Sequence, residues 1–350
     1  MDDRKHHIIN GDRTAYVDWL DSRGEIINAS DGGILFVDGI YHWYGMALRP
    51  LPFRGHGEGG QTTTTGVVMY ASEDLLHWDY EGVILPCSDV KGHPLQGPLR
   101  FERPKIWFHR QSSSFILMCH YVQAPGDHGF IPGTGETGIA VCDRVNGVYE
   151  WMGTTRPVDD TGFVRDNGFY ADADGTGWYI FDRQVSDHFS TADPADRATD
   201  DRCLYILQMA ENGRDFSSRF RRMEEASWRE APVIVRQGDW YYLITSGLTS
   251  WDCNQALYYR TRDLLTPWTL MGDPCIDDTD HTTFHAQGSN TFRIMHGPNA
   301  GRAVFMAERH QTSNFLHSSY VWLPIDFHED GTLSITYRES WDPAGMEEAS

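Results

Sequence analysis

Residues 29–45 read Ala-Ser-Asp-Gly-Gly-Ile-Leu-Phe-Val-Asp-Gly-Ile-Tyr-His-Trp-Tyr-Gly, and this stretch predicts a β-hairpin. Two runs rich in β-branched and aromatic residues, 34–37 and 40–44, flank Asp38-Gly39, a dipeptide that favours a two-residue hairpin turn. A carboxylate, Asp31, stands directly ahead of the first run, beside two glycines that allow a sharp bend. The stretch is therefore a strand pair with an acid at its entrance.

The same unit recurs four more times along the chain. Strand, polar turn and strand are predicted over residues 104–122, 167–182, 231–246 and 290–309. Further short strands lie between the hairpins, so each repeat holds about four strands, as a propeller blade does. Five such repeats predict an all-β fold, a five-bladed β-propeller.

The organisation of the rest of the chain is simple. We expect residues 1–20 to be a lead-in that packs on the body, and residues 21–345 to form a single propeller. The best helical candidate, residues 224–229, is short. Long polar stretches rich in Gly and Pro are predicted to be loops on one propeller face, where function usually resides: 49–65, 123–137 and 186–202.

Composition and charge exclude several classes of partner. The 350 residues include 29 Lys and Arg against 50 Asp and Glu, a formal charge of −21 that repels nucleic acid and anionic membrane surfaces. A neutral partner is expected instead. The first residues contain no apolar segment long enough for a signal peptide, and six widely spaced cysteines are expected to be free thiols, so we expect a cytoplasmic protein.

An acid or its amide stands at the entrance of every predicted hairpin. The five residues, 57 to 71 positions apart, are Asp31, Glu102, Asp166, Glu230 and Gln287. The innermost strand of each propeller blade starts near the axis, so these side chains are predicted to converge on one funnel. Crowded carboxylates raise one another's pKa, which suits general acid and base catalysis.

Several motifs give the chain a resemblance to a known family. They are residues 24–45, Glu102-Arg103-Pro104-Lys105, Arg165-Asp166, Arg229-Glu230-Ala231-Pro232, Ala286-Gln287 and Tyr320-Val321-Trp322-Leu323-Pro324. Together, in this order over residues 17–340, they resemble glycoside hydrolase family 43, whose members are five-bladed propellers. The likeness is greatest to its galactan 1,3-β-galactosidase-like branch.

The resemblance implies roles for the axial residues. In the family at large, the matching positions make Asp31 the general base, Asp166 the residue that orients the acid and modulates its pKa, and Glu230 the general acid. The galactanase-like branch usually has glycine at the position of Asp31 and uses residues that match Glu102 and Gln287. This chain has both sets, so Glu102 and Gln287 are either an alternative base site or hydrogen-bond partners of the sugar.

The expected function follows from this resemblance. It implies an inverting exo-glycoside hydrolase that releases galactose from β-1,3-galacto-oligosaccharides, or L-arabinofuranose, from plant-derived oligosaccharides. A β-xylosidase of the same family is an alternative, because Asp31 departs from the galactanase pattern. A five-bladed glycoside phosphorylase and a non-catalytic carbohydrate-binding propeller are the alternatives from other classes.

Further site residues are candidates by type and position. Arg103, Arg165 and Arg229 are each adjacent to an axial acid and should point to the other strand face, as interblade ion pairs or as substrate contacts. Trp43, Phe169 and Trp251 are candidate platforms for the apolar faces of sugars, although most of the 12 tryptophans must be core. No cofactor is expected to be required. The resemblance allows a structural calcium on the axis with His285 as a ligand; the alternative is a buried, hydrogen-bonded imidazole.

Overall fold

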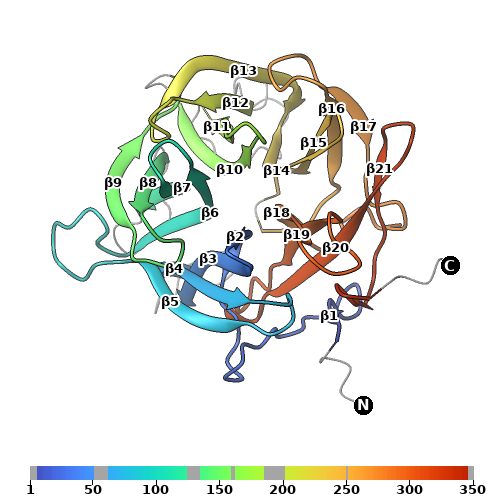
Figure 1. Cartoon of the computed structure of the whole chain (residues 1–350), viewed down its shortest axis with the longest axis horizontal. Coiled ribbons are helices and arrows are strands. Elements are labelled where there is room, and N and C mark those ends of the chain that lie inside the picture. The colour runs from blue at the N-terminus through green and yellow to red at the C-terminus, as the bar shows by residue number, and fades with distance from the viewer. Residues whose placement is uncertain are drawn as a thin grey trace.

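Five antiparallel four-stranded sheets stand around one axis in the computed structural model, which describes residues 6–50, 62–123, 135–158, 162–184, 202–249 and 251–345 (Figure 1). Each sheet is built from four strands that follow one another in the chain and pair in order. The inner strands contact one another in a ring, β2 with β6, then β10, β14, β18 and again β2. The predicted five-bladed propeller is confirmed.

The blades have the following strands. Blade 1 consists of β2 (Ser30–Val37), β3 (Ile40–Pro50), β4 (Thr62–Ser72) and β5 (Asp79–Pro86). Blade 2 consists of β6 (Leu99–His109), β7 (Ser114–Gln123), β8 (Glu136–Cys142) and β9 (Glu150–Thr155). Blade 3 consists of β10 (Phe163–Ala171), β11 (Gly177–Gln184), β12 (Cys203–Met209) and β13 (Phe216–Ser227). Blade 4 consists of β14 (Arg229–Gln237), β15 (Trp240–Gly247), β16 (Leu257–Thr261) and β17 (Thr269–Gly272). Blade 5 consists of β18 (Gln287–Arg293), β19 (Ala303–Arg309), β20 (Ser319–Phe327) and β21 (Leu333–Ile335).

The hairpin at the start of blade 1 forms as the sequence predicts. Val37 pairs with Ile40 across the turn, and Asp38 and Gly39 have φ values of 50° and 89°. Positive φ at both central residues is the requirement of a type I′ turn, which matches the twist of the flanking strands.

Two local predictions differ from the structure. Residues 224–229 are not helical, because they belong to the end of β13 and the start of β14. The acids predicted ahead of the inner strands lie within them or, for Gln287, at the first residue of the strand.

Of the predicted loops, residues 51–61, 124–134 and 186–201 lie outside the described residues. The one helical element in the described ranges is the 3₁₀ turn η2 (Phe315–His317), and no helix there has the length and apolar character needed to span a bilayer.

The ring closes between blade 5 and blade 1 by side-chain packing. Trp43 of β3 is fully buried against Trp322 of β20, with ring centroids 4.8 Å apart, and Trp19 of the lead-in packs on both. The amide of Asn10 donates to the carbonyl of Trp322 and accepts from its N–H, each at 2.9 Å. Near the chain ends, β1 (Ile8–Ile9) pairs with β22 (Ser340–Trp341) outside the ring (Figure 1).

The burial of Trp43 contradicts its predicted role as a sugar platform and gives it a structural one. Trp43→Phe is expected to lower the free energy of unfolding by about 2 kcal/mol, because the smaller ring leaves a cavity in the closure cluster. The kcat and KM of the folded variant should stay unchanged. Urea denaturation and steady-state kinetics at 25 °C check this, with the exposed Val148→Ala as a control. A raised KM at unchanged stability would contradict the structural role.

Candidate active site

Every inner strand is irregular close to its axial residue. The pairing register between the first two strands of a blade shifts between Ser30 and Gly33, Glu102 and Lys105, Val164 and Asn167, Glu230 and Val233, and Gly288 and Asn290. Such bulges change the direction of side chains at a strand end. In blade 1 the bulge depends on Gly32, since a Cβ there would lie 1.6 Å from the carbonyl oxygen of Tyr44.

Arg103 joins four blades at the axis. Its Nε lies 2.8 Å from Oδ2 of Asp166, and its Nη2 donates to Oε1 of Gln287 at 2.7 Å and lies 3.8 Å from Oδ1 of Asp31. Nη1 donates to the carbonyl oxygen of Gly288 at 2.8 Å. The expectation that Arg103 points to the other strand face is wrong, because the bulge, with φ 49° at Arg103, turns it toward the axis. Its guanidinium is buried and forms interblade ion pairs.

Arg165 and Arg229 form hydrogen bonds within their own blades. Nε of Arg165 donates to Oε1 of Gln184 at 2.6 Å, between β10 and β11. Arg229 donates to the hydroxyl and carbonyl oxygens of Thr245 and to the carbonyl oxygen of Gln255, all in blade 4. The predicted interblade role is therefore wrong for Arg229. Arg165 is buried and does not line the cavity described below, and its predicted contact with substrate stays a prediction.

Glu230 is a buried carboxylic acid beside other charges. Burial and the charge of Asp166 raise the pKa of Glu230 to about 8, against the opposing charge of Arg202. Oε1 accepts a hydrogen bond from Nε2 of Gln287 at 3.3 Å, and Oε2 lies 3.4 Å from Nη2 of Arg202. The second carboxylate, Asp166, accepts the backbone N–H of Ala231 at 3.1 Å. A carboxyl group that keeps its proton at neutral pH can donate it to a leaving oxygen.

Asp31 is held through its backbone by a residue that sequence reasoning missed. Glu308, at the end of β19, accepts the backbone N–H of Asp31 with Oε1 and the hydroxyl of Ser30 with Oε2, the latter at 2.8 Å. Burial and the charge of Asp31 raise the pKa of Glu308 to about 8. The signal for it was Glu308-Arg309-His310, three polar residues after the apolar run 303–307, which is buried throughout.

Lys105 also holds the backbone around Asp31 in place. Its Nζ is buried and donates to the carbonyl oxygens of Asp31, Pro104 and Gly32, at 2.8, 3.2 and 3.3 Å. Burial and the neighbouring charge of Arg103 lower the pKa of Lys105 to about 7. Asp31, with a left-handed φ of 58°, is thus fixed through its backbone on two sides while its carboxylate stays directed at the axis.

Glu102 is bound in a separate ion-pair group. Nδ1 of His120 lies 2.9 Å from its Oε2, and Nη1 of Arg100 donates to its Oε1 at 3.0 Å. Burial opposes ionisation, but the hydrogen bond and charge of His120 and the charge of Arg100 outweigh it and lower the pKa of Glu102 to about 2. A carboxylate with so low a pKa is a weak proton acceptor.

This low pKa makes Glu102 a source of acid sensitivity. A carboxyl whose pKa falls from 4.5 to about 2 on folding stabilises the fold above pH 4.5, and this stability is lost as the pH falls toward 2. Glu102→Gln should therefore lower the free energy of unfolding by up to about 3 kcal/mol at pH 6, and by less at pH 3. Urea denaturation at both pH values measures the difference, with the exposed Glu150→Gln as a control. A deficit that does not change with pH would contradict the ion-pair explanation.

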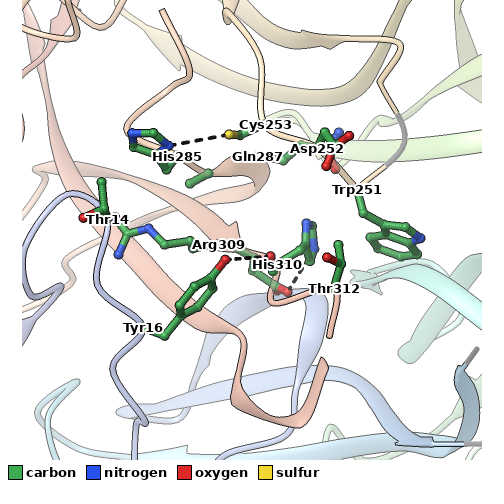
Figure 2. A pocket seen from close by; sticks show the side chains of 12 residues that line it. Thr14, Tyr16, Trp251, Asp252, Cys253, His285, Gln287, Arg309, His310 and Thr312 are labelled. Carbon is green, nitrogen blue, oxygen red and sulfur yellow. Dashed lines mark hydrogen bonds and ion pairs between the residues drawn. The ribbon is translucent and has the colours of Figure 1, made fainter. Parts of the chain in front are cut away.

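A cavity of about 170 Å³ opens beside these groups, between the lead-in and blades 4 and 5 (Figure 2). Its lining comprises Thr14, Tyr16, Trp251, Asp252, Cys253, His285, Ala286, Gln287, Glu308, Arg309, His310 and Thr312. Gln287 and Glu308 connect it to the axial group, whereas Glu230 and Asp31 are not in its lining.

Of the three aromatic residues predicted to be sugar platforms, only Trp251 lines the cavity. Trp251 lines it and packs edge-on against the rings of His310 and Phe315, at centroid distances of 4.8 and 5.0 Å. Phe169 does not, because it packs on Trp107 in the core between blades 2 and 3, with centroids 5.0 Å apart. Its predicted platform role is wrong, as is that of Trp43.

His285 lines the cavity, but among the described residues it does not belong to a cluster of metal-type ligands. Its Nδ1 lies 3.8 Å from Sγ of Cys253, and its Nε2 lies 3.8 Å from Oδ2 of Asp280. Among the residues that the structure describes, the group with metal-type atoms at metal-site spacing is Asp31, Glu308 and His310. The assignment of His285 as a ligand is therefore not supported by its neighbours, and the axial calcium stays a prediction.

Comparison with known proteins gives the family. The model of glycosyl hydrolases family 43 matches residues 59–333, which is most of the chain. The chain belongs to this family. It is therefore a glycoside hydrolase with its axial carboxylates in a family 43 propeller. No curated protein matches the sequence.

Solved structures, two of them named as family 43 enzymes, share the fold of this chain. A β-1,3-galactosidase solved with galactodeoxynojirimycin is 25% identical, with a TM-score of 0.78 over 96% of this chain and 100% of that chain. An exo-β-1,3-galactanase from Clostridium thermocellum is 25% identical, with a TM-score of 0.76 over 97% of this chain and 68% of that chain. A second β-1,3-galactosidase is 23% identical, with a TM-score of 0.78, and this chain spans only 63% of its length.

Proposed function

We propose that this family 43 hydrolase is an inverting exo-enzyme that releases terminal galactose from β-1,3-linked galacto-oligosaccharides. The observation that carries the proposal is a pair of carboxyl groups connected through Gln287 and Arg103: Gln287 hydrogen-bonds both Glu230 and Arg103, and Arg103 lies 3.8 Å from Asp31. Burial and the charge of Asp166 raise the pKa of Glu230 to about 8, so it is protonated at neutral pH, and the carboxylate of Asp31 lies beside the guanidinium of Arg103. The β-1,3-galactosidases and the galactanase of the same fold support the choice of sugar.

The proposed mechanism assigns one step to each carboxyl group. Glu230 protonates the leaving glycosidic oxygen, and Asp31 takes a proton from the water that attacks the anomeric carbon from the opposite face. Inversion requires about 6.5–9.5 Å between the two carboxyl groups, to leave room for that water. Arg103 and Gln287 lie between Glu230 and Asp31 and keep them out of contact. Asp166 adds negative charge that keeps the proton on Glu230.

A second candidate, release of L-arabinofuranose, is favoured by Asp31 itself. The galactanase-like branch usually has glycine at this position, whereas here the side chain is a carboxylate held in place by the hydrogen bonds of Glu308 and Lys105 to its backbone. Asp31 matches the general base of the family at large, and this match favours a substrate of the wider family, here an L-arabinofuranoside.

The experiment that tests the proposal separates the sugars and the stereochemistry. The enzyme is offered β-1,3-galactobiose and the 4-nitrophenyl β-galactopyranoside, α-L-arabinofuranoside and β-xyloside, with and without phosphate. We expect phosphate-independent hydrolysis of the galactosides, with α-galactose as the first product by proton NMR. Cleavage of the arabinofuranoside alone would select the second candidate. β-Galactose as the first product would contradict inversion, and a sugar 1-phosphate product would contradict hydrolysis.

A further inference from the structure

Three buried groups from blades 1 and 5 surround one point at the axial end of the cavity. Nε2 of His310 lies 4.0 Å from Oδ1 of Asp31 and 3.8 Å from Oε2 of Glu308, and one atom from each residue lies within 4.8 Å of the others. An oxygen atom just off the plane of this triangle is about 2.7 Å from all three, which is a hydrogen-bond distance.

We propose that Glu308 and His310 position the nucleophilic water for Asp31. This inference rests on the proposed inverting mechanism and deepens it. The water's oxygen bonds to the anomeric carbon as the glycosidic C–O bond breaks. One water proton passes to Asp31, and the leaving oxygen takes the proton of Glu230, so atoms and charges balance.

The imidazole ring of His310 is suited to hydrogen-bond a water molecule. The residue is 8% exposed, and within the described part of the chain its Nε2 has no hydrogen-bond partner. A buried polar nitrogen without a partner is costly, and a water molecule would satisfy it. The ring is held in orientation by Trp251 and Phe315. Burial lowers the pKa of His310, so its ring is uncharged at neutral pH and does not neutralise Asp31.

The charges around Glu308 favour water over a divalent cation at this point. The charged and titratable groups close enough to affect Glu308 are Asp31, Arg103, Lys105, Tyr320 and His310. Burial and the charge of Asp31 raise the pKa of Glu308 to about 8, so Glu308 is a neutral acid at pH 7 and a poor cation ligand, and the guanidinium of Arg103 lies 3.8 Å from Oδ1 of Asp31. A protonated Glu308 can donate a hydrogen bond to the water oxygen and leave a lone pair free for the sugar.

Two variants test the positioning role. Glu308→Met removes the carboxyl group at similar side-chain length, whereas Gln would keep a hydrogen-bond donor to the water. His310→Phe keeps the ring that packs on Trp251 and Phe315 while it removes Nε2. We expect each to lower kcat by about 100-fold with KM within about 3-fold, since general base catalysis on a well-held water contributes effects of this size. The melting temperature of His310→Phe should stay close to that of wild type, because no hydrogen bond between Nε2 and another described residue is lost. The exposed Glu329→Gln of the same blade is the control.

The outcomes separate this inference from the proposed function. If wild type hydrolyses with inversion but both variants keep the wild-type kcat, or raise KM instead, the positioning role is overturned and the function stands. If wild type does not hydrolyse with inversion, the proposed function fails first. Loss of activity with EDTA and its recovery with Ca²⁺ would place a cation at this point and overturn the water. If Glu308→Met fails to fold, His310→Phe decides.

Discussion

Glu230→Gln is expected to lower kcat/KM on β-1,3-galactobiose by about 10³-fold, because the leaving alkoxide then receives no proton. The loss should be much smaller on a 4-nitrophenyl glycoside, whose phenolate leaves without protonation. This dependence on the leaving group distinguishes a lost acid from a damaged fold. Rates on both substrates measure it, and Glu224→Gln, on the outer strand β13 with its side chain 78% exposed, is the matched control.

The pH dependence of kcat/KM is a second test of the role of Glu230 as the acid. Glu230 must be protonated to act, and its pKa is raised to about 8, so kcat/KM should stay high below that pH and fall as the pH rises through it. In Glu230→Gln the residual rate on the 4-nitrophenyl substrate should no longer fall with the ionisation of Glu230, so the decrease at alkaline pH should be smaller than in wild type. Equal losses on the two substrates, with an unchanged alkaline limb, would contradict the assignment of Glu230 as the acid.

Asp31→Asn is expected to be the other severe substitution, with a loss of about 10³-fold in kcat, because an amide cannot take the proton of the attacking water. The amide keeps the size of the side chain, and the backbone contacts of Asp31 with Glu308 and Lys105 do not involve the carboxylate. Azide, a nucleophile that needs no deprotonation, should restore turnover and yield the α-galactosyl azide from a β-galactoside. Product analysis by NMR checks this.

Glu102→Gln is the comparison that decides between the two base sites. Glu102 is ion-paired with His120 and Arg100 and has a pKa of about 2, so its substitution should cost less kcat than Asp31→Asn. If Asp31→Asn remains active and Glu102→Gln is inactive, the base lies at the second-blade site, as in the galactanase-like pattern.

Much of the architecture was predictable because it is encoded locally. The turn at Asp38-Gly39 and the recurrence of the hairpin depend on neighbouring residues, and both are confirmed. The axial acids were found for the same reason, since their position relative to each hairpin repeats. The direction of the Arg103 side chain was not predictable in this way, because it depends on a bulge in β6. The burial of Trp43 was not predictable either, because it depends on the closure of blade 5 on blade 1.

The sequence by itself thus determined the five blades and placed Asp31, Asp166, Glu230 and Gln287 near one axis. Only the tertiary structure decided which groups meet there. Asp31 and Glu308 are 277 residues apart and become hydrogen-bonded only when blade 5 closes on blade 1. The pKa values of Glu230 and Glu308 follow from that closure, since burial and a nearby carboxylate act on each of them only in the assembled ring.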